Sequence, residues 1–448
     1  MSQFKMKMAG RDTDEGNLLV LAVLASVIGL GAGLIGGLFR LSLQWADTER
    51  NALIAWAHGQ SVLGFAVIVG GVASATCIAA FLVRRLVPTA AGSGIPHIEG
   101  VLKGELTPAP LLLVPVKFVG GVLAIGSGLA LGREGPSVQM AVSLAHWVGQ
   151  TFRRTLADCR VLMAGAGGAG LATAFNAPLA GAIFVLEELV GRFEPRIAVV
   201  ALGASASAIS VARLLLGDTT AFVLPDVTAG GIAVKPFYIL LGLFTGGLAI
   251  FYNRSLLASV AAVDRLGWAP EARAFVIGAG VGTLAWFAPD LVGGGDPITQ
   301  RTLNGAEVIT MLPLLFLLRL ALGAASYSAG TPGGLLAPVL VLGAQTGLFF
   351  GLACRLLFPG MEIDPEAFAA VAMAAFFAGV VRAPVTGIAL VTEMTGSTAL
   401  LLPMVAASFT AMVVPTFVGN PPVYDSLGRR AAQLNRSPTT TSSRSAPN

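Results

Sequence analysis

The sequence predicts an all-α polytopic membrane protein whose helices are tilted and often interrupted. Of its 448 residues, 55% are hydrophobic and only 12% are charged, whereas soluble domains carry about 25% charged residues. Apolar runs recur along most of the chain, and several are shorter than the roughly 20 residues that cross a bilayer. Many of these runs begin at Gly or Pro, which is typical of broken helices around a transport site.

The expected helices are the apolar runs, taken in chain order. They lie near residues 18–38, 61–83, 109–131, 161–174, 177–190, 197–216, 232–252, 273–288, 308–325, 334–352, 366–380, 384–392 and 399–418. Together they form a transmembrane domain over residues 17–430. A polar segment, 1–16, precedes this domain, and a Ser/Thr/Pro-rich tail expected to be disordered follows over 431–448. No appended soluble domain is visible.

Composition also limits the partners and cofactors. The net charge of +4 is small and the basic residues stand in short connectors, so we expect a lipid bilayer and no nucleic acid as partner. Basic residues before the first span and after the last place both termini in the cytoplasm. The three cysteines are far apart and form no CxxC pair, so neither a disulfide framework, a metal site nor a cofactor is expected.

An internal repeat is indicated by one pattern of Pro, Gly and Glu that occurs twice with identical spacing. The repeat halves cover roughly residues 17–216 and 230–430. Identity alone does not say whether the halves run in the same or in opposite directions. The matched residues are Pro178, Gly181 and Glu187 in the first half, and Pro384, Gly387 and Glu393 in the second.

The repeat separates two neighbouring acids. Because Glu187 has the partner Glu393, we expect both to play a matched structural part, such as bonding to backbone N–H groups. Glu188 has no partner, since Met394 stands at the corresponding position, and it is the better candidate for a special task. Two alternatives remain for Glu188: a purely structural acid, or an ion pair with Arg192 one turn further on.

The segment Gly132-Arg133-Glu134-Gly135-Pro136 places a carboxylate inside an apolar stretch. A carboxylate at membrane depth is costly and indicates a functional site. The flanking glycines free the backbone, and Pro136 suits the first turn of a new helix. The positive end of such a helix attracts an anion, with which Glu134 can compete. The alternative is that Glu134 is a solvated loop residue.

Two further Gly/Pro segments, 92–96 and 333–338, also read as helix starts. Three helix starts that converge on one point would hold an anion by N–H dipoles without a full positive charge. The hydroxyls of Ser93 and Tyr424 could each donate one further hydrogen bond. Alternatively, Ser93 only caps a helix and Tyr424 is an interfacial anchor. Lys117, at the start of an apolar run, is expected to be a snorkelling or helix-end residue rather than a ligand.

This ordered set of elements resembles the CLC family of chloride channels and chloride/proton antiporters. The resemblance covers about residues 18–430 and includes the stretches 174–181 and 382–387. It implies a CLC-type inverted repeat and a homodimer with one separate pathway in each subunit. It also implies chloride and protons as the transported ions, and a bacterial-type inner membrane as the location.

The resemblance implies a role for each matching position. Glu134 would be the gate and the external proton-transfer group, and Glu188 the internal proton-transfer group. The remaining positions would bind chloride through hydroxyls or backbone amides; they are Ser93, Arg133, Gly135, Leu335, Leu336 and Tyr424. The sequence departs from the family at Leu336, where an aromatic residue is common, and at His97, where bacterial members often have an acid.

We therefore predict coupled exchange of chloride for protons, with a passive chloride channel of the same fold as the alternative. The presence of Glu188 favours the exchanger, because family channels generally lack an acid at this position. An intramembrane hydrolase is the rival from another class. The chain has no HExxH motif, and Ser93 has no clear His partner, so no enzymatic activity is expected.

Overall fold

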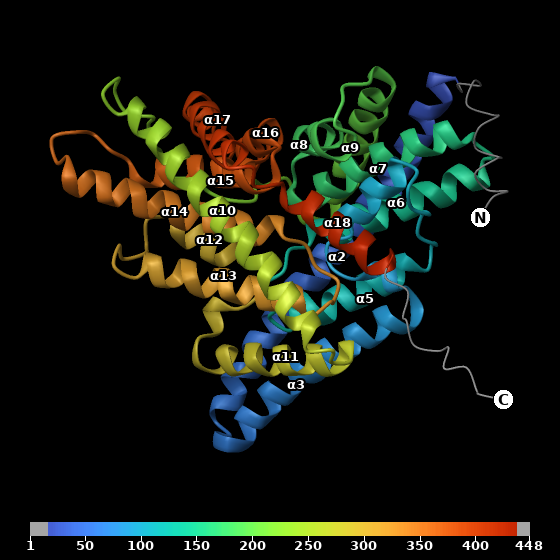
Figure 1. Ribbon diagram of the computed structural model, residues 1–448, viewed down its shortest axis with the longest axis horizontal. Coiled ribbons are helices and arrows are strands. Elements are labelled where there is room, and N and C mark those ends of the chain that lie inside the picture. Colours follow the sequence, from blue (N-terminus) through green and yellow to red (C-terminus); the bar gives the residue numbers. More distant parts are fainter. Residues whose placement is uncertain (1–16, 437–448) are drawn as a thin grey trace, which may run out of the picture.

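The structure, a computed structural model, describes residues 17–436, and these residues are almost entirely helical (Figure 1). The first half of the chain forms α2 (Leu18–His58), α3 (Ser61–Leu86), η1 (Pro88–Ala90), α4 (Ile95–Leu102), α5 (Leu113–Gly126), α6 (Glu134–Thr151), α7 (Leu156–Phe175), α8 (Pro178–Phe184), η2 (Val185–Leu189) and α9 (Pro195–Leu216). The second half forms α10 (Lys235–Arg265), α11 (Pro270–Phe287), η3 (Pro289–Leu291), α12 (Asp296–Leu303), α13 (Leu312–Ser328), α14 (Leu336–Leu357), α15 (Pro365–Val381), α16 (Pro384–Thr395) and α17 (Leu401–Phe417), followed by α18 (Val423–Arg436).

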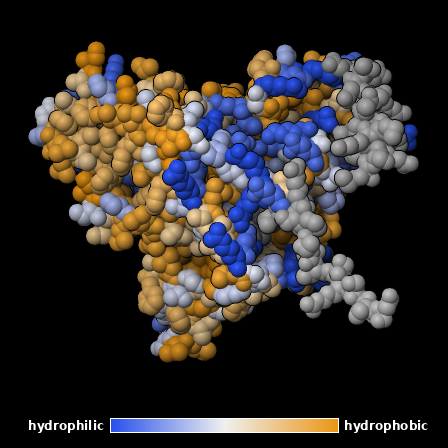
Figure 2. All heavy atoms as spheres, in the orientation of Figure 1, coloured by the Kyte–Doolittle hydropathy of each residue, from blue (hydrophilic) through white to orange (hydrophobic). Residues whose placement is uncertain are grey.

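The predicted all-α membrane fold with interrupted helices is confirmed. Among residues 17–436, five helices are long and apolar enough to cross a membrane, namely α2, α3, α9, α10 and α14. Other apolar helices, such as α5 with 14 residues and α15 with 17, are shorter than a bilayer span. Figure 2 shows hydrophilic residues gathered in the middle of one face and hydrophobic residues around its rim, which is where a bilayer would surround the molecule.

The two halves repeat the same order of elements. Each has a long first helix, a second long helix, a short 3₁₀ turn, an eight-residue helix and five further helices. In Figure 1 the two halves lie to the right and left of a central α18. They meet where α3 packs against α11 at the bottom of the view and where α8 packs against α16 at the top.

Reciprocal caps show that the halves run in opposite directions. The Glu187 carboxylate accepts from the N–H groups of Val385 (3.0 Å) and Thr386 (2.6 Å) at the start of α16. The Glu393 carboxylate accepts from two N–H groups in the first turn of α8, at 3.0 and 2.8 Å. Glu187 lies in η2, directly after α8, and Glu393 lies in the last turn of α16. Each acid therefore stands at the C-terminal end of one segment and caps the N-terminus of the other, so α8 and α16 are antiparallel. The predicted matched role of Glu187 and Glu393 is confirmed.

Small residues let the central helices pack closely. In α15 every residue except Glu366 is buried, and the helix consists mainly of Ala, Phe, Val and Gly. Its main neighbour is α14, where a Cβ on Gly343 would come within 2.8 Å of the Ala372 carbonyl oxygen and of Met373 Cα. Association of helices in a membrane depends on such close backbone approach.

The structure differs from the sequence-based expectation in two places. The helix α12 was not expected, because its residues Asp296, Gln300 and Arg301 are too polar to form an apolar run. Residues 431–436 are helical and belong to α18, so the tail does not begin at 431 as predicted. The rest of the predicted tail, 437–448, and the polar segment 1–16 lie outside the described residues.

Candidate anion and proton site

Three helix N-termini meet at the centre of the molecule, as the three Gly/Pro segments predicted. They are the starts of α4, α6 and α14, at Ile95, Glu134 and Leu336. Gly132 and Gly334 exchange two backbone hydrogen bonds of 2.8 and 2.7 Å, which join the loops before α6 and α14. The loop before α4 joins the same group, because the Gly333 N–H donates to the Gly92 carbonyl at 3.2 Å. The positive ends of these helices therefore surround one small region.

The carboxylate of Glu134 occupies that region. The side chain is fully buried, and its Oε1 accepts a hydrogen bond of 2.6 Å from the Leu336 N–H. Oε2 is buried and has no hydrogen-bond partner within residues 17–436. A Cβ on Gly334 would collide with this carboxylate, so glycine is required for the close approach. Glu134 is therefore not a solvated loop residue; its carboxylate lies where an anion would be attracted.

The hydroxyls of Ser93 and Tyr424 lie beside this carboxylate. Both side chains are fully buried, and the two hydroxyls are close to one another. Neither hydroxyl makes a hydrogen bond of acceptable geometry to another group in the described part of the chain. Buried hydroxyls normally have a hydrogen-bond partner. Because the Ser93 and Tyr424 hydroxyls lack one within the described residues, both can donate to an ion bound between them and Glu134. Tyr424 therefore lies in the interior and is not an interfacial anchor.

Lys117 fixes the loop that carries Ser93. Its ammonium is fully buried and donates to the carbonyls of Ala90 (3.0 Å), Gly92 (2.8 Å) and Ser93 (3.4 Å). The expectation of a snorkelling or helix-end lysine is therefore wrong. A sequence of Lys117 followed by an apolar run does not distinguish a lysine that reaches solvent from one that folds back on a loop.

Arg319 is the counterpart of Lys117 in the second half. It is buried on α13, and its guanidinium donates to the carbonyls of Leu291 (3.0 Å) and Gly293 (3.1 Å). The loop that contains Leu291 and Gly293 lies directly before α12, in the same way that the loop containing Ser93 lies directly before α4. The position that corresponds to Ser93 is Gly294, which has no hydroxyl. Both halves therefore have a buried cation that holds the loop, but only the loop of the first half carries a hydroxyl.

The side chain of Arg133 braces the loop rather than pointing at the anion region. Its Nη1 forms an ion pair of 2.6 Å with Asp296 at the start of α12, and its Nε donates to the Ala174 carbonyl at 2.8 Å. Any contact of Arg133 or Gly135 with an anion would therefore use the backbone, as the prediction states. We call this end of the site, bounded by Arg133 and Asp296, the Arg133 mouth.

Glu188 is a second acid in the neighbourhood of Tyr424. It belongs to the π-helical turn η2, a distortion that is frequent at functional sites. Tyr424 has both Glu134 and Glu188 among its charged neighbours. The alternative pair with Arg192 is not formed, because Arg192 pairs with Glu194 at 3.1 Å. Since Glu187 caps α16, the two adjacent acids have different surroundings, as the repeat predicted.

Charged groups that the sequence analysis did not select surround Glu188. They are Glu99 on α4, Asp425 on α18 and Lys103. The Glu99 carboxylate is buried and 3.9 Å from the Lys103 ammonium, while Asp425 is exposed. Because Glu99 and Lys103 are far from both Glu188 and Asp425 in the chain, no spacing in the sequence could have grouped them with Glu188. Glu188 therefore has charged neighbours on α4 and α18, one of which, Asp425, is exposed at the surface.

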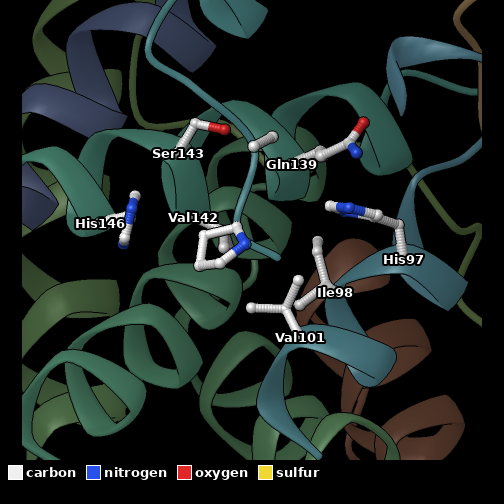
Figure 3. Close-up of a pocket in the computed structure, with 9 residues that line it drawn as sticks. His97, Ile98, Val101, Gln139, Val142, Ser143 and His146 are labelled. Atoms are coloured by element: carbon white, nitrogen blue, oxygen red, sulfur yellow. The ribbon is translucent and has the colours of Figure 1, made fainter. Parts of the chain in front are cut away.

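His97, which the sequence left without a role, lines a small cavity between α4 and α6 (Figure 3). The cavity has a volume of about 10 Å³, enough for one water molecule. Gln139 and His146 of α6 lie on its other walls, as the figure shows. Gln139 Oε1 and His146 Nδ1 are buried and lack hydrogen-bond partners among the described residues. His97 therefore faces this small cavity, whose walls combine polar side chains with apolar ones such as Ile98 and Val101.

Comparisons with known proteins agree with this arrangement. Residues 75–416 match the family described as "Voltage gated chloride channel". An H(+)/Cl(-) exchange transporter, ClcA, of Vibrio cholerae serotype O1 is 35% identical over 439 residues, which cover 94% of this chain and 91% of the relative. The ClcA of Cronobacter sakazakii is 36% identical over 419 residues, or 91% and 89% of the two chains. The solved structure of a slow cyanobacterial Cl-/H+ antiporter superposes with a TM-score of 0.89 at 32% identity, covering 94% of this chain and 100% of that one.

Proposed function

The chain belongs to the voltage gated chloride channel family, and we propose that it is a secondary active transporter that exchanges chloride for protons. The relatives named above are exchange transporters that cover nearly the whole chain. These relatives are transporters, and no enzymatic role is proposed for this chain. The transported ions would be the only small ligands, and no metal or cofactor is part of the proposal.

One observation carries this proposal: a carboxylate occupies the region where three helix N-termini converge. The 2.6 Å hydrogen bond from the Leu336 N–H to Glu134 Oε1 is the kind of contact that a chloride ion would take. Chloride and the Glu134 carboxylate therefore compete for the same donors. When Glu134 accepts a proton, it loses its charge and its attraction for these dipoles, so chloride replaces it.

The exchange requires that protons and chloride use the centre in turn. Chloride that enters the centre would be held by the Leu335 and Leu336 amides and by the hydroxyls of Ser93 and Tyr424. The proton that Glu134 carries would pass to Glu188 and leave through the polar groups around it. Because one negative charge replaces another at the centre, the charge of the region changes little during the cycle. Binding is then weak enough for the ion to leave.

A passive chloride channel is the competing function within the same fold. A channel needs the anion site but gives no reason for a second acid, Glu188, beside Tyr424 and close to an exposed carboxylate, Asp425. The structure around Glu188 therefore favours the exchanger.

The test of the exchange is the substitution Glu188→Gln, which keeps the size of the side chain and removes its proton-carrying group. We expect proton flux in liposomes to fall to the leak level while chloride flux continues, because the anion site does not contain Glu188. Proton release and chloride release are measured in parallel with a pH electrode and a chloride electrode. Undiminished proton flux in this variant would remove Glu188 from the proton path.

The anion preference is tested by Ser93→Pro. Without the hydroxyl and with a different loop, we expect the selectivity to shift from chloride towards nitrate, since one donor of the anion site is lost. The ratio of chloride to nitrate transport in liposomes gives the result. An unchanged ratio would count against the place of Ser93 in the anion site.

The same proposal includes the assembly and its orientation. We propose a homodimer in an inner membrane, with one pathway in each subunit and both termini in the cytoplasm, so that the Arg133 mouth faces outward. Large hydrophobic side chains are exposed on α8, α9, α16 and α17, which lie along one edge of the subunit (Figure 1). Examples of these side chains are Leu179, Leu202, Leu402 and Phe409.

A further inference from the structure

A polar cavity lies beside the Arg133 mouth, outside the anion site described above. Its volume of about 180 Å³ is far more than the 10–15 Å³ that one water molecule needs. Its walls are formed by α2, by α9 and the loop after Leu216, and by Asn176, which directly follows α7. The lining side chains that carry polar groups are Arg40, Gln44, Asn176, Arg213, Thr219 and Thr220.

Arg40 is the cation of this cavity that has no acidic partner. Its Nη1 donates to the Thr173 carbonyl at 3.3 Å, and its buried Nε has no hydrogen-bond partner in the part of the chain that the structure describes. No carboxylate of residues 17–436 lies within 4.0 Å of its guanidinium. A partly buried arginine without an anion is costly, and guanidinium N–H groups are strong donors for anions. Arg40 is therefore equipped to bind an anion that enters the cavity.

The opposite wall is held in place by its own hydrogen bonds. Arg213 Nε donates to Asn176 Oδ1 at 3.1 Å, and its Nη1 pairs with the exposed Asp218 at 2.8 Å. The Asn176 side-chain amide donates to the Thr219 carbonyl at 2.7 Å. These bonds fix a second guanidinium at the cavity before any ligand arrives, which lowers the cost of ordering on binding.

The cavity is connected to the anion site through the end of α7. Arg40 and Arg133 hold the adjacent carbonyls of Thr173 and Ala174, and Arg133 precedes Glu134 in the chain. Of the guanidinium groups of Arg40, Arg133 and Arg213, only that of Arg40 has no carboxylate within ion-pair distance in the described part of the chain, since Asp296 pairs with Arg133 and Asp218 with Arg213. The guanidinium of Arg40 therefore attracts small anions to the cavity beside the Arg133 mouth.

We propose that this cavity is a docking site for a small inorganic anion, such as chloride, which waits there before it reaches Glu134. The inference rests on the proposed function in one respect only, namely that chloride is the ion transported. The size of the cavity lets the ion keep part of its water, so that it binds weakly and is released towards Glu134. The site would raise the local concentration of the ion rather than select it.

Bromide is the probe, because its anomalous X-ray scattering locates the ion in crystals of the full-length protein. We expect an anomalous peak between Arg40 and Arg213 in wild-type crystals soaked in bromide, and its loss in Arg40→Gln. The matched control is Arg301→Gln, which removes one arginine of α12 that does not line the cavity and should leave the peak in place. No peak in the wild-type cavity, when bromide occupies the central site, would overturn the proposal.

Transport gives the second readout. With ionic strength held constant by an impermeant anion, Arg40→Gln should raise the half-saturating chloride concentration several-fold, and Arg40→Lys by less. The maximal rate and the ratio of protons to chloride should not change. An equal increase in Arg301→Gln would show a general field effect and would overturn the docking site.

A separate variant covers the case in which Arg40→Gln does not fold. Thr219→Glu adds a carboxylate at the cavity wall and leaves Arg40 in place; it should displace bromide from the cavity and raise the half-saturating chloride concentration. Bromide that persists in the cavity of this variant would contradict the proposal. A chloride channel without proton coupling would also bind bromide in this cavity. The proposed exchange and the proposed docking site can therefore fail separately.

Discussion

Liposomes that contain the Glu134→Gln protein are expected to transport chloride without moving protons. Glutamine keeps the shape of the side chain, and it can still accept the hydrogen bond from the Leu336 N–H through its amide oxygen. It can neither carry a negative charge into the anion region nor take up a proton. Chloride flux should therefore lose its dependence on a pH gradient, and proton flux should fall to the leak level. Both are measured with ion-selective electrodes.

The control for this experiment is Glu393→Gln. Glu393 belongs to the repeat and caps α8, so its substitution weakens a structural contact without touching the centre. This variant should keep the proton-to-chloride ratio of the wild type even if its thermal stability falls. Chloride uptake that is still driven by a pH gradient in Glu134→Gln would exclude Glu134 as the gate.

Substitution of Lys117 is expected to have the second large effect. In Lys117→Met the carbonyls of Ala90, Gly92 and Ser93 lose their common donor. A buried carbonyl left without a partner costs about 1–3 kcal/mol. The Gly92 carbonyl keeps its bond from the Gly333 N–H, so the expected loss of stability comes from the Ala90 and Ser93 carbonyls. The Ser93 loop would also lose its position at the anion site. We expect a lower midpoint of thermal unfolding in detergent and a several-fold weaker apparent affinity for chloride.

Arg319→Met separates the loss of stability from the loss of chloride binding. Arg319 holds the loop of the second half that corresponds to the Ser93 loop. Its loop carries Gly294 where the other carries Ser93. We therefore expect Arg319→Met to lower the unfolding midpoint but to leave the chloride-to-nitrate selectivity unchanged. If Lys117→Met binds chloride as the wild type does, Lys117 does not position Ser93.

The sequence was sufficient for those features that depend on local pattern. Gly and Pro at the starts of α4, α6 and α14 are local signals, because glycine and proline have distinct backbone preferences. The equal spacing that links Glu187 with Glu393 indicated a matched bonding role, and the structure confirms it with reciprocal caps. The site roles of Ser93 and Tyr424 remain predictions, supported by their burial beside Glu134.

Features that depend on tertiary contacts were not accessible from the sequence. Lys117 begins an apolar run, but only the folded chain shows that its ammonium turns back onto the Ser93 loop. The Arg133–Asp296 pair joins residues 163 positions apart, and the polarity of α12 hid its correspondence with α4. A signal was present, because Gly295 and Pro297 repeat the spacing of Gly94 and Pro96. The direction of the repeat also required the antiparallel contact of α8 with α16.

The central claim is coupled exchange, and proton movement driven by chloride tests it most directly. Purified wild-type protein is placed in liposomes with a chloride gradient, and potassium with valinomycin clamps the membrane potential. Exchange predicts that protons move against their own gradient, in the direction opposite to chloride, until the chloride gradient is dissipated. Chloride movement with no accompanying movement of protons would contradict the account and would show a chloride channel in which Glu188 is a structural residue.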